Sequence, residues 1–277
     1  MTAQPMRCRS VLFTPGNRLE LLAKVKRWEP DVVVVDLEDA IPAGEKEAAR
    51  DGLGKAGLKL LGCPVLVRVN PDGTPWHDAD VEATVRSGAT GIVLPKAEVP
   101  ERVGALAGRL ADERMPALML GIETARGIAA ARDLFVDGVT GAYFGAEDYI
   151  ADVGGRRTST GLEVLYARSA VVLAARLAGV PAVDQAVVAF NDDEAFRADA
   201  EAGRDLGYSG KLCIHPRQVA LAHAAFTPGE AEVAAARNVV EAASKGVGIV
   251  DGVMVDAVHL RAAQQVLAQT SPEADGE

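Results

Sequence analysis

The stretch Ala117–Thr124 reads Ala-Leu-Met-Leu-Gly-Ile-Glu-Thr, and Gly141–Asp148, after a helix-like segment, reads Gly-Ala-Tyr-Phe-Gly-Ala-Glu-Asp. Each is an apolar run that stops at carboxylates, Glu123 in the first and Glu147 and Asp148 in the second. Short, near-continuous apolar runs are typical of buried parallel strands. Two neighbouring strands that end in this way place their carboxylates on one edge, where they can hold a divalent cation.

Similar apolar segments recur along the chain. We expect strands, in chain order, at Ser10–Pro15, in the run that follows Asp31, and at Val65–Asn70, Gly91–Lys96, Ala117–Thr124, Val139–Asp148, Ala182–Val187 and Gly210–His215. Helices are expected at Arg18–Trp28 with Asn17 as its cap, Glu45–Leu61, Asp78–Ser87, Glu101–Asp112, Ser159–Leu177, Asp192–Leu206, and from Pro216 to about Ala225. A strand followed by a helix, eight times over, predicts a (β/α)8 TIM barrel in the α/β class.

The alternative α/β architecture is a doubly wound sheet. That fold would need a Gly-x-Gly-x-x-Gly fingerprint after its first strand, and Thr-Pro-Gly-Asn-Arg at 14–18 does not provide it. A barrel also explains why polar residues end so many strands, since barrel enzymes carry their chemistry at that face. The residues expected there are Asp36, Glu38, Asp39, Arg68, Asn70, Lys96, Glu123, Asp148, Asp184 and His215.

The chain after the barrel is expected to form a separate part. Thr227-Pro228-Gly229 breaks the helical pattern, so we place the barrel at residues 1–226 and a C-terminal extension at 227–277. Two helices are expected in the extension, at Glu230–Lys245 and Asp256–Ala268. A closed barrel has no place for them, so they are expected to serve as a lid or an oligomer contact. The polar tail at 271–277 is expected to be disordered.

Composition excludes several classes of protein. The chain has 277 residues and a formal net charge of −10, which argues against a nucleic-acid binder because such proteins carry a basic face. Its three cysteines are sparse and odd in number, so a disulfide framework is not expected. Residues 1–10 have no apolar core for a signal peptide, and no stretch is apolar enough for a membrane span. We therefore expect a cytoplasmic protein.

The predicted strand ends suggest a chemistry. Glu123 and Asp148 supply two oxygen ligands, which suits Mg²⁺ because this ion takes one or two carboxylates and keeps several waters. Arg68 offers a forked donor for a carboxylate or a developing enolate. A metal and an arginine in one pocket can stabilise an enolate, which points to making or breaking a carbon–carbon bond beside a carbonyl.

Plainer roles remain open for the same groups. Arg68 could be an ion-pair partner of Glu38 or Asp39, and these two acids could serve only to position Arg68 or Lys96. His215, which precedes a proline, is more often a structural, hydrogen-bonded histidine than a catalyst.

At these residues the sequence resembles the citrate lyase β-subunit-like family, the acyl-CoA lyases that include malyl-CoA and citramalyl-CoA lyases. The matching pieces lie in family order from about residue 10 to 260. They are Ser-Val-Leu-Phe-Thr-Pro-Gly-Asn at 10–17, Asp-Leu-Glu-Asp-Ala at 36–40, Val-Arg-Val-Asn at 67–70, Leu-Pro-Lys at 94–96, Gly-Ile-Glu-Thr at 121–124, Gly-Ala-Glu-Asp at 145–148, Gly-Lys-Leu-Cys-Ile-His-Pro at 210–216 and Asp-Gly-Val-Met-Val-Asp at 251–256.

The resemblance implies a Mg²⁺-dependent barrel that acts on CoA thioesters and a 2-keto acid, as a homo-oligomer that is usually a trimer or hexamer. It assigns the metal to Glu123 and Asp148 and substrate binding to Arg68. It makes Asp256 the acid/base, delivered from the lid of a neighbouring subunit. Positions that touch substrate or CoA are Phe13, Lys24, Ile214 and His215. Apart from the resemblance, we expect Asp36, Glu38, Asp39 and Lys96 to surround and position the residues that bind metal and substrate. Where some relatives have a second lysine near the CoA phosphates, this chain has Glu20.

Two rival functions stay open. One is an aldolase for pyruvate or oxaloacetate that uses the same site without CoA. Such an enzyme would not need the residues beyond about 226, whereas a CoA lyase needs Asp256. The other is a catalytically silent binding subunit of a lyase assembly. Glu20 favours this alternative, and it is opposed by the intact Arg68, Glu123, Asp148 and Asp256. The sequence does not distinguish among malyl, citramalyl and citryl thioesters as the substrate. Nor does it decide the physiological direction, or whether the thioester is hydrolysed after condensation.

Overall fold

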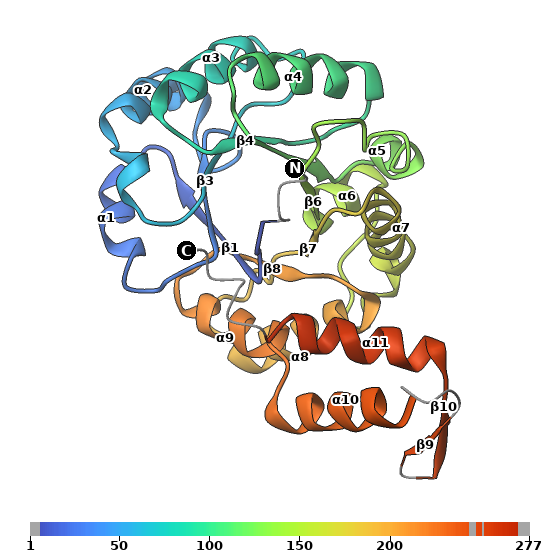
Figure 1. The fold of residues 1–277 in the computed structure, drawn as a ribbon. Helices are drawn as coiled ribbons and strands as arrows, with labels where there is room; N and C mark the ends of the chain where they lie inside the picture. The colour runs from blue at the N-terminus through green and yellow to red at the C-terminus, as the bar shows by residue number, and fades with distance from the viewer. Residues whose placement is uncertain (1–5, 244–247, 251, 271–277) are drawn as a thin grey trace. The chain divides into compact units, whose positions relative to one another are not determined.

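The structure is a computed structural model that describes residues 6–243, 248–250 and 252–270. Eight parallel strands follow one another around a closed barrel, in which each strand pairs with its neighbours in the sequence and β8 closes on β1 (Figure 1). The predicted (β/α)8 barrel is confirmed. The strands are β1 Ser10–Pro15, β2 Val32–Asp36, β3 Val65–Arg68, β4 Gly91–Leu94, β5 Ala117–Ile122, β6 Gly141–Phe144, β7 Ala182–Asp184 and β8 Gly210–Cys213.

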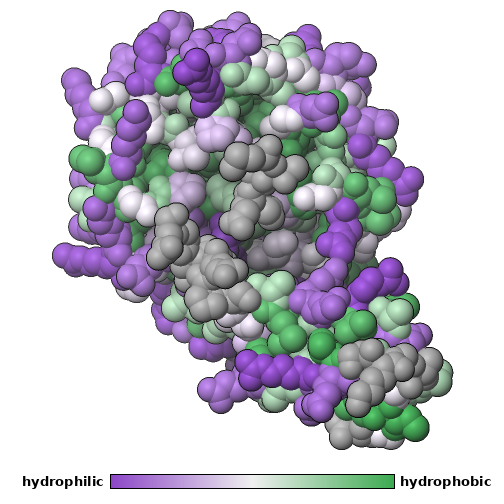
Figure 2. Space-filling model, viewed as in Figure 1, coloured by the Kyte–Doolittle hydropathy of each residue, from purple (hydrophilic) through white to green (hydrophobic). Residues whose placement is uncertain are grey.

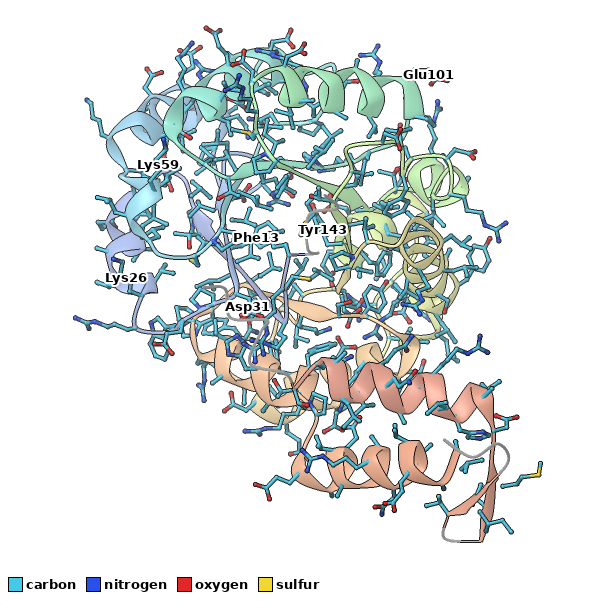
Figure 3. All side chains as sticks on the ribbon, viewed as in Figure 1. Phe13, Lys26, Asp31, Lys59, Glu101 and Tyr143 are labelled. Carbon is cyan, nitrogen blue, oxygen red and sulfur yellow. The ribbon has the colours of Figure 1, made fainter. Side chains whose placement is uncertain are left out.

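Alternate residues of the strands fill the interior of the barrel. One buried cluster takes at least one residue from every strand, including Val11, Val34, Leu66, Met119 and Tyr143. Because side chains alternate between the two faces of a strand, the neighbours of these residues face the helices instead. Figure 3 shows Phe13 and Tyr143 within the ring of strands.

Helices surround the strands, and hydrophilic side chains cover most of the periphery of the barrel unit in the view of Figure 2. No helix among the described residues is long and apolar enough to cross a membrane. The helical segments, 3-10 turns included, are η1 Leu19–Leu21, α1 Leu22–Val25, η2 Ala43–Glu45, α2 Lys46–Gly52, η3 Leu53–Lys55, η4 Leu58–Leu60, α3 His77–Ser87, α4 Pro100–Asp112, α5 Ala125–Ala129, α6 Ala146–Asp152, α7 Leu162–Ala178, α8 Asp193–Leu206 and α9 Arg217–Phe226.

The first two predicted helices are wrong in extent. The Asn17 side chain does not cap a helix, because its Nδ2 donates to Glu45 Oε2 at 2.7 Å. The helix expected at Glu45–Leu61 ends at Gly52 and continues only as two 3-10 turns. Gly57 separates these turns with a φ of +61°, a left-handed conformation that glycine adopts without steric cost.

Most strands end earlier than the sequence suggests, and the difference matters most at β6. The apolar run was expected to extend to Asp148, but β6 ends at Phe144 and the chain turns at once into α6. Asp148 therefore lies in the first turn of α6 rather than at the end of a strand. Negative side chains in the first turn are favoured by the partial positive charge of a helix N-terminus.

Asp184 is not at the open end of the barrel. Val183 packs in the interior, so its neighbour Asp184 points into the helical layer, where it is fully buried. There it accepts from Arg168 Nε at 2.8 Å and from Lys211 Nζ at 2.5 Å. Asp199 of α8 also bonds to Lys211 and lies 3.3 Å from Arg168 Nη1. These four residues form a charge network that ties β7 and β8 to α7 and α8.

We expect Asp199→Asn to lower the free energy of unfolding by about 2–3 kcal/mol at pH 7, because two buried cations lose a carboxylate partner. Burial opposes ionisation, but the charges of Lys211 and Arg168 hold the pKa of Asp199 below its usual value. Such a carboxyl stabilises the fold above its unfolded pKa of about 3.9, and this contribution is lost as the pH falls.

The difference in unfolding free energy between wild type and Asp199→Asn, measured by urea denaturation, should therefore be steady from pH 7 to about 5 and shrink below about 4. Asp205→Asn, on an exposed position of the same helix, is the control and should change little. A difference that stays constant down to pH 3 would contradict the role given to this network.

The chain divides into two compact units, Met1–His223 and Ala224–Glu277. In the second, the helices α10 Glu230–Ala243 and α11 Ala257–Ala268 pack against each other. Between them the strands β9 Gly248–Val250 and β10 Val253–Val255 form an antiparallel hairpin, which the sequence patterns did not predict. The tail at 271–277, expected to be disordered, lies outside the described residues.

Candidate active site

A cavity of about 130 Å³ lies at the carboxyl ends of the barrel strands. Strands β1, β3, β6 and β8, the segments that follow β5, β7 and β8, and the start of α6 line it. The lining residues are Phe13, Arg68, Glu123, Tyr143, Gly145, Ala146, Glu147, Asp148, Ala186, Leu212 and Ile214. A wider, open hollow of about 640 Å³ lies over 188–194 and Arg197. The smaller cavity is the better candidate, since it is the one lined by Arg68 and Glu123, which are largely buried titratable groups.

Glu123 is the most enclosed acid of the cavity. Its side chain is 1% exposed, and Oε1 accepts from the Lys96 amide at 2.9 Å and from the Tyr143 hydroxyl at 3.2 Å. Burial, together with the nearby charges of Glu38 and Asp148, raises the pKa of Glu123 to about 7 although Arg68 opposes the rise. A bound cation would favour the ionised form of Glu123 and so lower this pKa again.

Two glycines make room for the Glu123 carboxylate. A Cβ atom on Gly145 would overlap Glu123 Oε2, and a Cβ atom on Gly121 would overlap the hydroxyl of Tyr143 and lie 2.9 Å from Glu123 Oε1. The backbone of β5 and that of the turn after β6 thus approach the carboxylate more closely than any residue with a side chain would allow. The sequence patterns contain both glycines, but their role and that of Tyr143 emerge only from the pairing of Gly121 with Tyr143 across the two strands.

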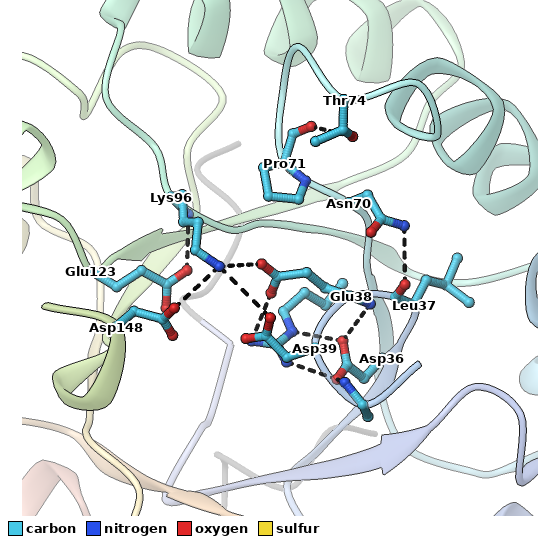
Figure 4. Close-up of polar contacts among 12 residues, drawn as sticks. Asp36, Leu37, Glu38, Asp39, Asn70, Pro71, Thr74, Lys96, Glu123 and Asp148 are labelled. Atoms are coloured by element: carbon cyan, nitrogen blue, oxygen red, sulfur yellow. Dashed lines mark hydrogen bonds and ion pairs between the residues drawn. The ribbon is translucent and has the colours of Figure 1, made fainter. Parts of the chain in front are cut away.

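Lys96 connects the acidic residues (Figure 4). Its Nζ lies 2.5 Å from Glu38 Oε1, 3.2 Å from Asp148 Oδ1 and 3.8 Å from Asp39 Oδ1. Burial opposes the charged form of Lys96, but Glu38, Asp148 and Glu123 raise its pKa above the usual value. Burial in turn raises the pKa of Glu38, with Arg68 and Lys96 working against it.

Arg68 is held rigidly at the end of β3. Its Nε and Nη2 donate to the two carboxylate oxygens of Asp36, each at 2.7 Å, and its Nη1 lies 3.0 Å from Glu38 Oε2. The guanidinium also lies over the ring of Phe13, 5.1 Å from the centroid. Although Asp36 is buried, the charge and hydrogen bonds of Arg68 hold its pKa below the usual value. Asp36 and Glu38 therefore position Arg68, and Asp39 lies further away, at 3.8 Å.

The residues present fit a magnesium ion. The atoms that could coordinate the ion are carboxylate oxygens. Glu123 is a buried acid whose ionised form is disfavoured without a cation. Among the described residues no group of three or more His, Cys, Asp and Glu side chains could hold a metal. The carboxylates of Glu123 and Asp148 suit Mg²⁺, which uses one or two carboxylates and fills the remaining positions with water and substrate oxygens.

The expected substrate-binding residues are only partly brought together. Phe13 and Ile214 line the cavity beside Arg68, whereas Lys24 and His215 are not part of its lining. Lys24 is exposed on α1, and the His215 ring stacks on Phe190 with 5.3 Å between centroids. Glu20 is exposed and pairs with Arg18 at 2.5 Å.

Asp256 lies in the second unit, where it caps α11. Its Oδ1 accepts from the amide of Val258 at 2.9 Å, and its side chain is 45% exposed. The pKa of Asp256 is lowered by its hydrogen bond with His259 and then by the amides of Val258 and His259. The structure thus shows a capping residue with an accessible carboxylate that is ionised at neutral pH.

Sequence reasoning missed a second polar chain at the cavity edge. Arg157 donates to Glu147, and its Nη1 donates to Gln185 Oε1 at 3.2 Å. Gln185 Nε2 in turn donates to Asp199 Oδ1 at 3.0 Å. The Glu147 carboxylate is therefore paired with an arginine, unlike that of its neighbour Asp148, and no local sequence signal separates the two.

A parallel barrel with three carboxylates and a fixed arginine in a cavity at its strand ends has the arrangement of a barrel enzyme with an acidic site. The chain belongs to the HpcH/HpaI aldolase/citrate lyase family, whose model matches residues 9–216. This membership confirms the resemblance seen in the sequence and identifies the chain as an enzyme of the lyase type.

Individual relatives and a solved structure agree with this family assignment. The chain is 48% identical to a citrate lyase subunit beta-like protein of Deinococcus radiodurans, over 97% of this chain and 99% of that protein. It is 35% identical to a (3S)-malyl-CoA thioesterase of Cereibacter sphaeroides, over 94% of each. It is also similar to the crystal structure of CitE from Mycobacterium tuberculosis in complex with magnesium, acetoacetate and coenzyme A, with a TM-score of 0.84, 32% identity, and 97% and 98% of the two chains covered.

Proposed function

We propose that this protein is a Mg²⁺-dependent carbon–carbon lyase that cleaves, or forms, a short 3-hydroxyacyl-CoA thioester such as malyl-CoA, citramalyl-CoA or citryl-CoA. The products of cleavage are an acyl-CoA and a 2-keto acid. The observation that carries the proposal is the convergence of Glu123, Asp148 and Arg68 on one small cavity. The magnesium, acetoacetate and coenzyme A bound by the similar CitE structure support it.

Glu123 and Asp148 would hold Mg²⁺, which when bound supplies Lewis-acid polarisation to the oxygens of the acid half of the substrate. In the cleavage direction a base removes the hydroxyl proton, the carbon–carbon bond breaks, and its electron pair passes to the thioester as an enolate. Arg68 faces the developing negative charge with a guanidinium that Asp36 already orients, so little reorganisation is needed. Phe13 and Ile214 would contact the apolar part of the substrate.

Asp256 would complete the reaction by protonating the enolate carbon, or by removing that proton in the condensation direction. The assignment rests on the motif at 251–256, and it places residues 227–277 as a lid that reaches the cavity of a neighbouring subunit in a homotrimer or hexamer. Its exposed carboxylate, ionised at neutral pH, suits a base in the condensation direction.

The test of the function is product analysis. The purified protein is incubated with malyl-CoA, citramalyl-CoA and citryl-CoA, with Mg²⁺ or with EDTA, and the products are separated by chromatography. A lyase yields a 2-keto acid and an acyl-CoA in equal amounts, only with Mg²⁺. Cleavage of a CoA-free hydroxy acid with no turnover of any thioester would favour the aldolase instead.

Thioester hydrolysis is a second candidate, favoured by the 35% identity to a (3S)-malyl-CoA thioesterase. It breaks the carbon–sulfur bond with water and releases free CoA and the free hydroxy acid. The same chromatogram separates the two activities, because free CoA appears in hydrolysis and acyl-CoA in carbon–carbon cleavage. An early excess of free CoA over 2-keto acid would make hydrolysis the main reaction.

Asp256→Asn should lower kcat by about 10²–10³-fold while Mg²⁺ and 2-keto acid binding stay unchanged, because only the proton transfer is lost. Asparagine keeps the side-chain oxygen that caps α11, so the fold should be retained. Mixed oligomers refolded from Asp256→Asn and Arg68→Met subunits should recover activity if Asp256 acts in a neighbour's cavity. Full activity of Asp256→Asn would remove this residue from the mechanism.

A further inference from the structure

Lys96 contacts both of the carboxylates assigned to the metal. Its backbone N–H donates to Glu123 Oε1 at 2.9 Å, and its side-chain Nζ lies 3.2 Å from Asp148 Oδ1 (Figure 4). The same Nζ bonds to Glu38 Oε1 at 2.5 Å. One residue therefore fixes one ligand through the main chain and covers the other with a positive charge.

The main chain at Lys96 is strained in a way that produces this double contact. Its φ of +49° lies in the left-handed region, which costs a residue with a Cβ atom about 1–2 kcal/mol. Strained residues persist where the surroundings hold them and cluster at functional sites. Here the turn after β4 directs the amide towards Glu123 and the side chain across to Glu38 and Asp148.

The ammonium and a metal ion cannot share Asp148 at low cost. Magnesium binds carboxylate oxygens at about 2.0–2.1 Å. An ion on Asp148 Oδ1 would therefore lie within a few ångströms of an ammonium 3.2 Å from the same oxygen, and the two would repel each other. Glu38 and Asp39, at 2.5 and 3.8 Å from Nζ, can retain the ammonium once it leaves Asp148.

We propose that the Lys96 ammonium is a built-in cation that occupies Asp148 in the metal-free enzyme and withdraws to Glu38 and Asp39 when Mg²⁺ binds. The inference rests on the proposed function, because it takes Glu123 and Asp148 as the ligands. If this is so, Lys96 weakens Mg²⁺ binding in the absence of substrate. At the same time, its positive charge reduces the repulsion among the acids of the cavity.

The test is calorimetric titration of MgCl₂ alone into four folded proteins: wild type, Lys96→Met, Lys55→Met and Glu123→Gln. Lys96→Met keeps the amide that bonds to Glu123 and removes only the competing charge, so its Mg²⁺ affinity should rise by about tenfold or more. Lys55→Met removes the same charge at an exposed site on η3 and should bind as wild type does. Lys96→Gln serves as a second variant if the methionine does not fold.

The outcomes separate the two hypotheses. Tighter binding in the Lys96 variant together with no binding in Glu123→Gln supports both. Equal or weaker binding in the Lys96 variant, with no binding in Glu123→Gln, overturns the role of Lys96 and leaves the metal site in place. Wild-type affinity in Glu123→Gln overturns the metal site itself.

Discussion

Glu123→Gln should abolish measurable Mg²⁺ binding and lower kcat by about 10³-fold or more, since loss of the metal removes several kcal/mol of transition-state stabilisation. The change is nearly isosteric, so the hydrogen bonds from the Lys96 amide and from Tyr143 can persist on the remaining oxygen. The substitution removes the negative charge of Glu123, the most enclosed acid of the cavity. Steady-state kinetics with saturating Mg²⁺ and a direct metal titration measure the two effects.

Glu147→Gln is the matched control, because this neighbouring acid also lines the cavity but is paired with Arg157. It should change kcat by less than about tenfold. Gly145→Ala offers an independent check that alters no charge, since the added Cβ atom would displace the Glu123 carboxylate. Metal binding that survives in Glu123→Gln but disappears in Glu147→Gln would show that the wrong acid has been assigned.

Arg68→Lys should lower kcat/KM by about 10²–10³-fold although the charge is kept. A lysine cannot donate to both oxygens of Asp36 in the fixed geometry of the guanidinium, so the positive charge would no longer be held towards the cavity. The pKa of Arg68 is raised well above its usual value by Asp36 and Glu38 although burial opposes them, so the group is a permanent cation.

The control for Arg68 is Arg102→Lys. Arg102 also contacts both oxygens of one carboxylate, that of Asp72, at 2.8 and 2.9 Å, but through Nη1 alone and on an exposed surface outside the cavity. This variant should retain wild-type kinetics and stability within error. If Arg68→Lys proved as active as Arg102→Lys, the arginine would be only an ion-pair partner and another group would have to stabilise the enolate.

The barrel could be predicted from the sequence because its strands are buried on both faces and read as short apolar runs. The fold follows from their number and from the helical segments between them. The ends of the strands were harder to predict than their existence. The apolar run Val139–Asp148, for example, continues past Tyr143, where the pairing of β6 with β7 stops. The turn from β6 into α6 depends on the backbone after Phe144 rather than on hydrophobicity.

The candidate site could be predicted in part for a similar reason. Glu123, Asp148 and Arg68 stand out because charged groups follow apolar strands, and the barrel brings strand ends together. Asp184 satisfies the same pattern but faces the helices, because one residue of register decides which side of a strand is interior. The partners of Lys96, 58 residues from Glu38 and 52 from Asp148, have no local signal at all.

The most direct test of the account is calorimetric titration of oxaloacetate, pyruvate and glyoxylate into wild type and Glu123→Gln, each with and without Mg²⁺. We predict that wild type binds one or more of these acids only when Mg²⁺ is present, and that Glu123→Gln binds none. Binding that is unaffected by both Mg²⁺ and the substitution would contradict the claim that Glu123 and Asp148 form a metal-dependent site for a 2-keto acid.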